Sequence, residues 1–114
     1  MLQNILRKKG ISVEVIDLRT LVPLDKETIV KSVKKTGRLL IVDEGYESFG
    51  VAAEITAAIE KDVFYDLDMP ISRLAAPDVP IPFSPALEKL IVPTEKSNSE
   101  CDQRACLTTD VEYI

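Results

Sequence analysis

An uninterrupted apolar run, Leu39-Leu40-Ile41-Val42, constrains the fold of this chain more than any other feature. A run without polar alternation is typical of a strand that is covered on both faces of a sheet. A helix is predicted just before this run. Asp25 is a good N-cap for its start, and Gly37 can end it in a left-handed conformation. A helix that feeds directly into a doubly covered strand predicts an α/β fold with a largely parallel sheet.

The alternation of strands and helices extends to both sides of this run. Residues 12–18 are rich in β-branched side chains and predict a strand, and residues 71–75 predict another. Apolar residues at helical spacing predict a helix that begins near residues 48–50 and runs toward Val63. Residues 1–10 have the pattern of the end of a longer helix. The expected sheet of about three strands is small for a domain.

A proline-rich segment follows the last predicted strand. Residues 76–85 contain four prolines, which prevent a regular ladder and predict a stiff, extended surface segment. Ser84 can cap a short helix that has Pro85 at its first position. The apolar residues of that helix are expected to face inward; they are Leu87, Leu90 and Ile91.

Length and composition limit the domain count and the class of partner. The 114 residues suit one domain, which we assign to residues 1–93. Residues 94–114 are polar and without periodicity, and we expect them to form a poorly ordered tail. The net charge is −5 and the basic residues are scattered, which disfavours nucleic acid as a partner. No apolar run approaches the roughly 20 residues that span a bilayer, so we expect a cytoplasmic protein that does not enter membranes.

Histidine is absent from the sequence, so any catalysis must rest on carboxylates, Lys, Tyr or Cys. Asp17, Asp43 and Glu44 lie at predicted strand ends, where α/β proteins place active-site groups. They can be read as a paired acid and base, but capping or salt-bridge roles are favoured. Arg19 is expected to pair with one of these carboxylates, and together Arg19, Asp43 and Glu44 are candidates for fixing the loops.

Two further groups of residues have a functional and a structural interpretation. Gly45 and Gly50 could border a phosphate site at a helix N-terminus, but ordinary turn chemistry is the favoured role. Cys101 and Cys106 cannot complete a tetrahedral zinc site alone, and we interpret them as spectator thiols. The sequence therefore assigns no catalytic, cofactor-binding or metal-binding residue.

Bulky residues in the loops are candidates for a protein interface. Aromatic and aliphatic side chains beside proline-stiffened backbone lose little entropy on binding. The candidate interface residues are Tyr46, Phe49, Pro80, Ile81, Pro82 and Phe83. The alternative is that the aromatic and aliphatic members fold back onto the core of the domain, and the sequence leaves both possibilities open.

Four segments, in one order and spacing, resemble a known family: residues 15–25 (VIDLRTLVPLD), 42–46 (VDEGY), 49–55 (FGVAAEI) and 76–83 (APDVPIPF). They are similar to the transketolase-like C-terminal domain of the E1 β subunit of thiamine-diphosphate-dependent 2-oxo acid dehydrogenases, of the pyruvate, branched-chain and acetoin types. The similarity covers about residues 5–93. It implies a three-layer α/β/α sandwich with a mostly parallel sheet, here without its first strands.

The resemblance also implies a function. In this family an α subunit and the N-terminal domain of a β subunit hold thiamine diphosphate and Mg²⁺, and that N-terminal domain supplies a Glu and a catalytic His. Neither residue has a counterpart here, so we expect a subunit-association domain that binds no cofactor and is not catalytic alone. Expected partners are a second copy of the chain, E1 α or β subunits, or E2 subunits. The alternatives are a working dehydrogenase component completed by partner chains, and a small-molecule regulatory module.

Overall fold

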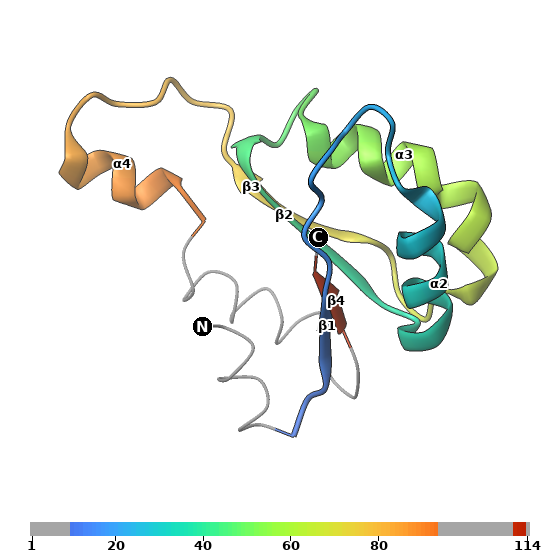
Figure 1. The fold of residues 1–114 in the computed structure, drawn as a ribbon. Coiled ribbons are helices and arrows are strands. Elements are labelled where there is room, and N and C mark those ends of the chain that lie inside the picture. Colours follow the sequence, from blue (N-terminus) through green and yellow to red (C-terminus); the bar gives the residue numbers. More distant parts are fainter. Residues whose placement is uncertain (1–9, 94–110, 114) are drawn as a thin grey trace.

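The computed structural model describes residues 10–93 and 111–113. Four strands form an all-parallel sheet in the order β1-β4-β2-β3. The elements are β1 (Val13–Val15), α2 (Lys26–Thr36), β2 (Leu39–Tyr46), α3 (Val51–Val63), the 3₁₀ turn η1 (Phe64–Asp66), β3 (Ser72–Ala76), α4 (Pro85–Ile91) and β4 (Val111–Tyr113). Helices α2 and α3 cover one face of the sheet, and α4 lies on its other side (Figure 1). The α/β class is therefore confirmed.

Helix α2 forms where the capping pattern predicted it. The Asp25 carboxylate accepts a hydrogen bond from the Thr28 amide at 3.1 Å and another from the Thr28 hydroxyl at 2.7 Å. At the other end Gly37 adopts φ 72°, and its amide donates to the Val33 carbonyl at 2.7 Å. Ile29 and Val33 are fully buried on the inner side of the helix. The caps and the apolar stripe together fix the length and the orientation of α2.

The apolar run at the start of β2 is buried on both faces, as predicted. Leu39 and Ile41 belong to the core cluster that includes residues of α2 and α3, whereas Leu40, which alternation turns to the opposite face, is also fully buried. From α3, the core receives four residues at helical spacing: Ala52, Ile55, Ile59 and Val63. The main described core therefore lies between β2 and the two helices that cover it.

The C-terminal end of the chain differs from expectation. We predicted a poorly ordered tail for residues 94–114, but Val111–Tyr113 form β4 between β1 and β2, so the sheet has four strands instead of about three. Val13 pairs with Val111, and Leu40 pairs with Tyr113. Val and Tyr favour strands, and β4 provides hydrogen-bonding partners for backbone groups of both β1 and β2. Residues 94–110 and 114, like the predicted helix over residues 1–9, lie outside the described residues.

Helix α4 begins with Pro85 after Ser84, as predicted, but its apolar residues do not face inward. Leu87 is 53% exposed and Leu90 is 79% exposed, and only Ile91 is partly buried. The extended segment before α4 carries it away from the sheet (Figure 1), so the described core offers these side chains no surface to pack against. The inward prediction was wrong because helical spacing identifies an apolar face without showing what covers it.

No helix among the described residues is long and apolar enough to cross a membrane.

Candidate functional site

The loops that follow β2 and β3 are joined by hydrogen bonds at the carboxyl end of the sheet. The Glu47 amide donates to the Ala76 carbonyl at 2.9 Å, and the Ser48 amide donates to Asp78 Oδ1 at 3.2 Å. The Ser48 hydroxyl donates to the other oxygen of the Asp78 carboxylate. Arg73, on β3, donates from Nη1 to the Glu47 carbonyl at 3.0 Å. Residues from separate parts of the sequence therefore form one connected surface.

The Asp43 carboxylate accepts hydrogen bonds from backbone amides on both sides of the loop between β2 and α3. Its Oδ1 accepts from the Gly45 amide at 3.0 Å, and its Oδ2 accepts from the Ala52 amide at 3.4 Å, in the first turn of α3. A capping or salt-bridge role was expected for Asp43, and its contact with an amide in the first turn of α3 is of the capping kind. Because this carboxylate already lies at the positive end of the helix, it would repel a phosphate there. Glu44, the neighbouring candidate, is exposed.

The glycine before α3 has a steric role. A Cβ atom on Gly50 would lie 2.2 Å from the Tyr46 carbonyl oxygen, closer than any real contact. Gly50 has φ −87°, which any residue can adopt, so the close approach of the backbone is what requires glycine here. This agrees with turn chemistry as the role of Gly50.

Arg19, which was expected to pair with one of the three carboxylates at the strand ends, forms an ion pair with Asp17. Arg19 Nη2 lies 3.1 Å from Asp17 Oδ2, but the two side chains are 87% and 70% exposed. Such a pair contributes little to stability, and whether it fixes the loop stays a prediction. Asp17 and Asp43 both line a hollow of about 230 Å³ between the loop after β1 and the start of α3. The structure thus brings these two carboxylates to one region, where Asp17 is held by Arg19 and Asp43 by backbone amides.

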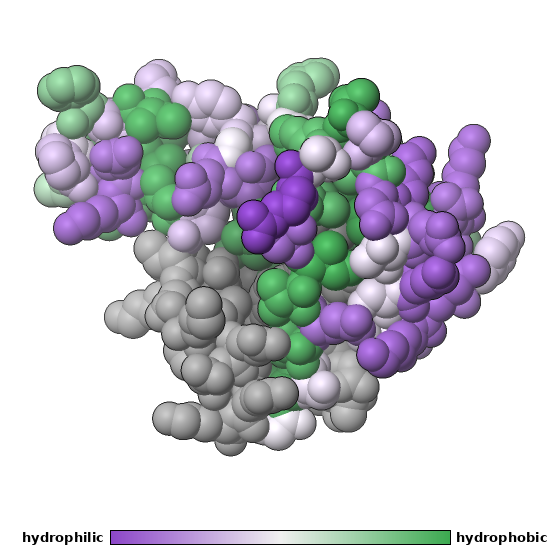
Figure 2. All heavy atoms as spheres, in the orientation of Figure 1, coloured by the Kyte–Doolittle hydropathy of each residue, from purple (hydrophilic) through white to green (hydrophobic). Residues whose placement is uncertain are grey.

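The candidate interface residues lie at the surface. Phe49 and Phe83 are completely exposed, Tyr46 and Ile81 are exposed by about half, Pro80 is exposed and Pro82 is partly buried. The alternative that these side chains fold back onto the described core is therefore wrong. Figure 2 shows hydrophobic residues at the top of the molecule, where Figure 1 places the loops at one end of the sheet. A role in subunit contact stays a prediction for all six residues.

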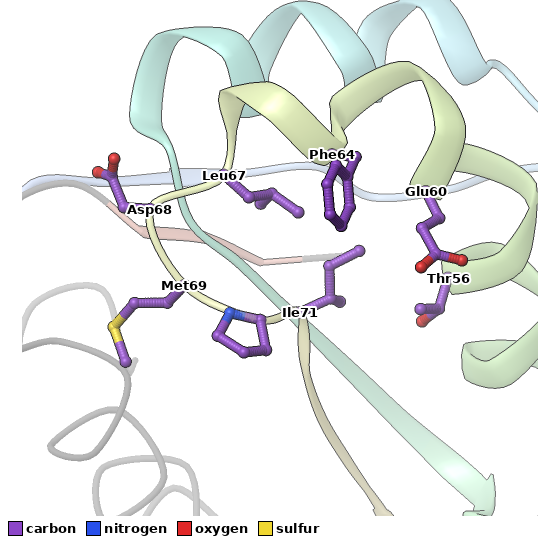
Figure 3. Close-up of a pocket in the computed structure, with 8 residues that line it drawn as sticks. Thr56, Glu60, Phe64, Leu67, Asp68, Met69 and Ile71 are labelled. Atoms are coloured by element: carbon purple, nitrogen blue, oxygen red, sulfur yellow. The ribbon is translucent and has the colours of Figure 1, made fainter.

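A cavity of about 400 Å³ at the opposite end of β3 was not foreseen. Phe64, Leu67 and Ile71 point into it, and the side chains of Thr56 and Glu60 form one wall (Figure 3). Asp68 and Met69 also line it but point away from its centre in Figure 3. The apolar residues that follow the end of α3 were the signal in the sequence, but their spacing alone cannot show that they surround a space.

The described carboxylates are either dispersed or engaged in local contacts. Within residues 10–93 and 111–113, no three His, Cys, Asp or Glu side chains are arranged to hold a metal ion. The carboxylates at the strand ends are used as a helix cap and a surface ion pair. Cys101 and Cys106 lie outside the described residues, so their role as spectator thiols stays a prediction.

An all-parallel sheet whose one face is covered by α2 and α3 places the chain among α/β proteins. Residues 2–97 match the profile of the family described as transketolase, C-terminal domain, and the chain belongs to this family. The predicted similarity to the C-terminal domain of E1 β subunits is thereby confirmed.

Curated relatives specify the branch of this family. The chain is 48% identical over 103 residues to the pyruvate dehydrogenase E1 component subunit beta of Rickettsia felis, covering 90% of this chain and 32% of that protein. It is 46% identical over 103 residues to the mitochondrial subunit beta-1 of Oryza sativa subsp. japonica, covering 90% and 28%. For the mitochondrial subunit beta of Chaetomium thermophilum the identity is 50% over 94 residues, covering 82% and 25%. The chain thus spans a third or less of the length of these relatives.

Proposed function

We propose that this chain is a subunit-association domain of the pyruvate dehydrogenase E1 β type and does not catalyse 2-oxo acid oxidation alone. The observation that carries the proposal is the surface formed by the loops after β2 and β3. Hydrogen bonds join the two loops, and Phe49 and Phe83 extend from them into solvent. Rigidly presented aromatic side chains are effective interface anchors because little conformational entropy is lost on binding.

We propose that the described residues do not hold thiamine diphosphate with Mg²⁺, the cofactor that the family implies. A diphosphate needs hydrogen-bond donors and positive charge, but the Asp43 carboxylate lies at the N-terminus of α3. A magnesium ion needs converging oxygen ligands, and the described acidic residues form no such group.

A second candidate function is a working component of a thiamine-diphosphate-dependent 2-oxo acid dehydrogenase. It is favoured by the 48% identity to a pyruvate dehydrogenase E1 subunit beta across 90% of the chain. In that case other chains supply the cofactor-binding domains, and this chain contributes a surface that those domains contact. E1 α, E1 β and E2 subunits, or a second copy of this chain, are the proposed partners, and we propose a cytoplasmic location.

Light scattering and calorimetry on the full chain test the proposal. We expect an oligomer at tens of micromolar, or a complex when E1 α and E1 β chains of a relative are added, and no heat from thiamine diphosphate with Mg²⁺. A chain that stays monomeric and joins neither partner would contradict the association role. Micromolar cofactor binding by the chain alone would contradict the non-catalytic assignment, whereas dehydrogenase activity only in the mixture would favour the second candidate.

A further inference from the structure

We propose that the cavity between the end of α3 and the start of β3 binds a small organic cation, an ammonium group attached to an apolar chain. The cavity has a volume of about 400 Å³, which lies within the range of small-molecule sites. It lies at the opposite end of β3 from the loops that carry Phe49 and Phe83. The inference therefore goes beyond the association role proposed above and does not depend on it.

The floor of the cavity is apolar and is fixed by the core of the domain. Leu67 and Ile71 point into the cavity (Figure 3), and both are only partly exposed because they also pack against the core cluster. Between them lies Pro70, whose ring restricts the backbone that connects η1 to β3. This floor is formed before any ligand arrives, so an apolar chain can bind there with little rearrangement of the protein.

One wall of the cavity is formed by Thr56 and Glu60, which lie one turn apart on the same side of α3 (Figure 3). The Thr56 hydroxyl donates its hydrogen to the Ala52 carbonyl at 2.8 Å, so only its lone pairs remain for a ligand. The Glu60 carboxylate makes no hydrogen bond or ion pair in the part of the chain that the structure describes. When ionised it can only accept hydrogen bonds. Both polar groups of this wall therefore require a ligand that donates.

The backbone around the cavity does not favour an anion. The amides of Phe64, Leu67 and Asp68 donate to carbonyl groups of the chain itself, so these donors are already used. Pro70 has no amide hydrogen. An anionic ligand would also be repelled by the Glu60 carboxylate, whereas a cation with N–H groups can donate to it. The polar groups of the cavity thus select for positive charge.

An aromatic ring distinguishes an organic cation from a metal ion. The Phe64 ring points into the cavity (Figure 3), and it packs edge to face against the Tyr65 ring with centroids 5.2 Å apart. The face of such a ring attracts an ammonium group. A divalent metal ion needs several converging oxygen ligands, and the residues described offer no cluster of three acidic side chains. One carboxylate, one ring and an apolar floor therefore fit an ammonium group on an apolar chain.

The test is a titration of the full chain with hexylammonium chloride, followed by NMR of the backbone amides. Hexanol and hexanoate, which have the same chain length, are the neutral and anionic controls. We expect saturable shifts with hexylammonium at Thr56, Glu60, Leu67 and Ile71, and binding of both controls that is at least about fivefold weaker. Equal binding of hexanol would mean that the cavity is merely apolar and would overturn the proposal, as would the absence of saturable shifts at these residues.

Glu60→Gln and Asp62→Asn form a matched pair of variants. Each replaces an exposed carboxylate of α3 by its amide, but Asp62 does not line the cavity. We expect Glu60→Gln to raise the dissociation constant of hexylammonium at least about threefold and Asp62→Asn to leave it unchanged. The amide spectra of both variants show whether the fold is kept. Equal effects of the two substitutions would mean that overall negative charge attracts the cation, and the site at Glu60 would be wrong.

A lysine side chain of another protein carries the same ammonium chemistry, so a third arm separates the two sources. Nα-acetyl-lysine N-methylamide is titrated under the same conditions as hexylammonium. Its polar amide groups do not match the apolar floor, and we expect it to bind more weakly than hexylammonium. Equal or tighter binding would assign the cavity to a lysine of a partner protein and would overturn the small-molecule assignment. The association role is tested separately by light scattering and survives either result.

Discussion

Gly50 lies where the loop after β2 becomes α3, and its backbone passes directly beside the Tyr46 carbonyl. Gly50→Ala should destabilise the domain by about 1–3 kcal/mol, because the added Cβ meets backbone that cannot move independently. Urea unfolding followed by circular dichroism gives the difference. Gly45→Ala is the control, since its nearest neighbour would be the Asp43 carboxylate at 3.2 Å, a side chain that can move. Equal losses in the two variants would contradict the close-approach argument.

The same region shows which properties of single residues could be predicted from sequence. A capping or salt-bridge role was expected for Asp43 because the sequence offers no catalytic pattern around it, and in the structure its carboxylate accepts from an amide in the first turn of α3. Phe49 adopts φ 56° in a loop whose Ser48 amide is hydrogen-bonded to Asp78, a residue distant in sequence. Turn propensity does not predict a phenylalanine in this conformation, so the sequence could identify Phe49 as bulky and in a loop but not as strained.

At the scale of elements, α2 has a cap whose strength depends on pH. The hydroxyl and amide of Thr28 donate to Asp25 and hold the pKa of that carboxyl below its ordinary value of 3.8. A lowered folded-state pKa means that the stabilisation is fully present above the unfolded pKa and is lost as pH falls through the folded one. Asp25→Asn should therefore reduce the fall in melting temperature on acidification below about pH 4. If the melting temperature of the variant falls on acidification as much as that of wild type in the same buffers, this cap does not contribute to the pH dependence of stability.

Helix α3 packs against the core through the buried residues of its inner face. Ile59 is completely buried in the core between β2 and the helices, so Ile59→Ala should destabilise the domain by about 2–5 kcal/mol through lost burial and the cavity that remains. Ala57→Ser, at an exposed position of the same helix, should change the free energy of unfolding by no more than about 0.5 kcal/mol. Chemical denaturation of both variants decides whether the described core is the main source of stability.

Elements differ in how far local pattern determines them. Helix α2 carries both caps and an apolar stripe, and β2 carries a continuous apolar run, so their type and approximate position could be predicted. Helix α4 has apolar spacing as well, but Leu87 and Leu90 are exposed because the segment before it leads away from the described core. Periodicity shows which face of a helix can be buried, and only the tertiary arrangement shows whether that face is buried.

For the molecule as a whole, the least predictable feature is the sheet order. Strand β4 has three residues, too few for a periodic pattern, and it pairs with β1 and β2 from the far end of the sequence. The preference for adjacent sequential strands would have paired β1 with β2 directly. The sequence could therefore indicate a parallel sheet but not the strand that joins its two halves.

This arrangement makes β4 the element whose loss should affect both of its neighbours. Val111→Pro removes a backbone donor and restricts the preceding residue, which is incompatible with a central strand. We expect faster hydrogen exchange at Val13–Val15 and at Leu39 and Leu40, together with aggregation, because β1 loses its strand partner and β2 becomes an edge of the sheet. Val111→Ile keeps the amide and the strand propensity, and its exchange rates should match wild type. If Val111→Pro leaves exchange in β1 unchanged, the position of β1 does not depend on β4.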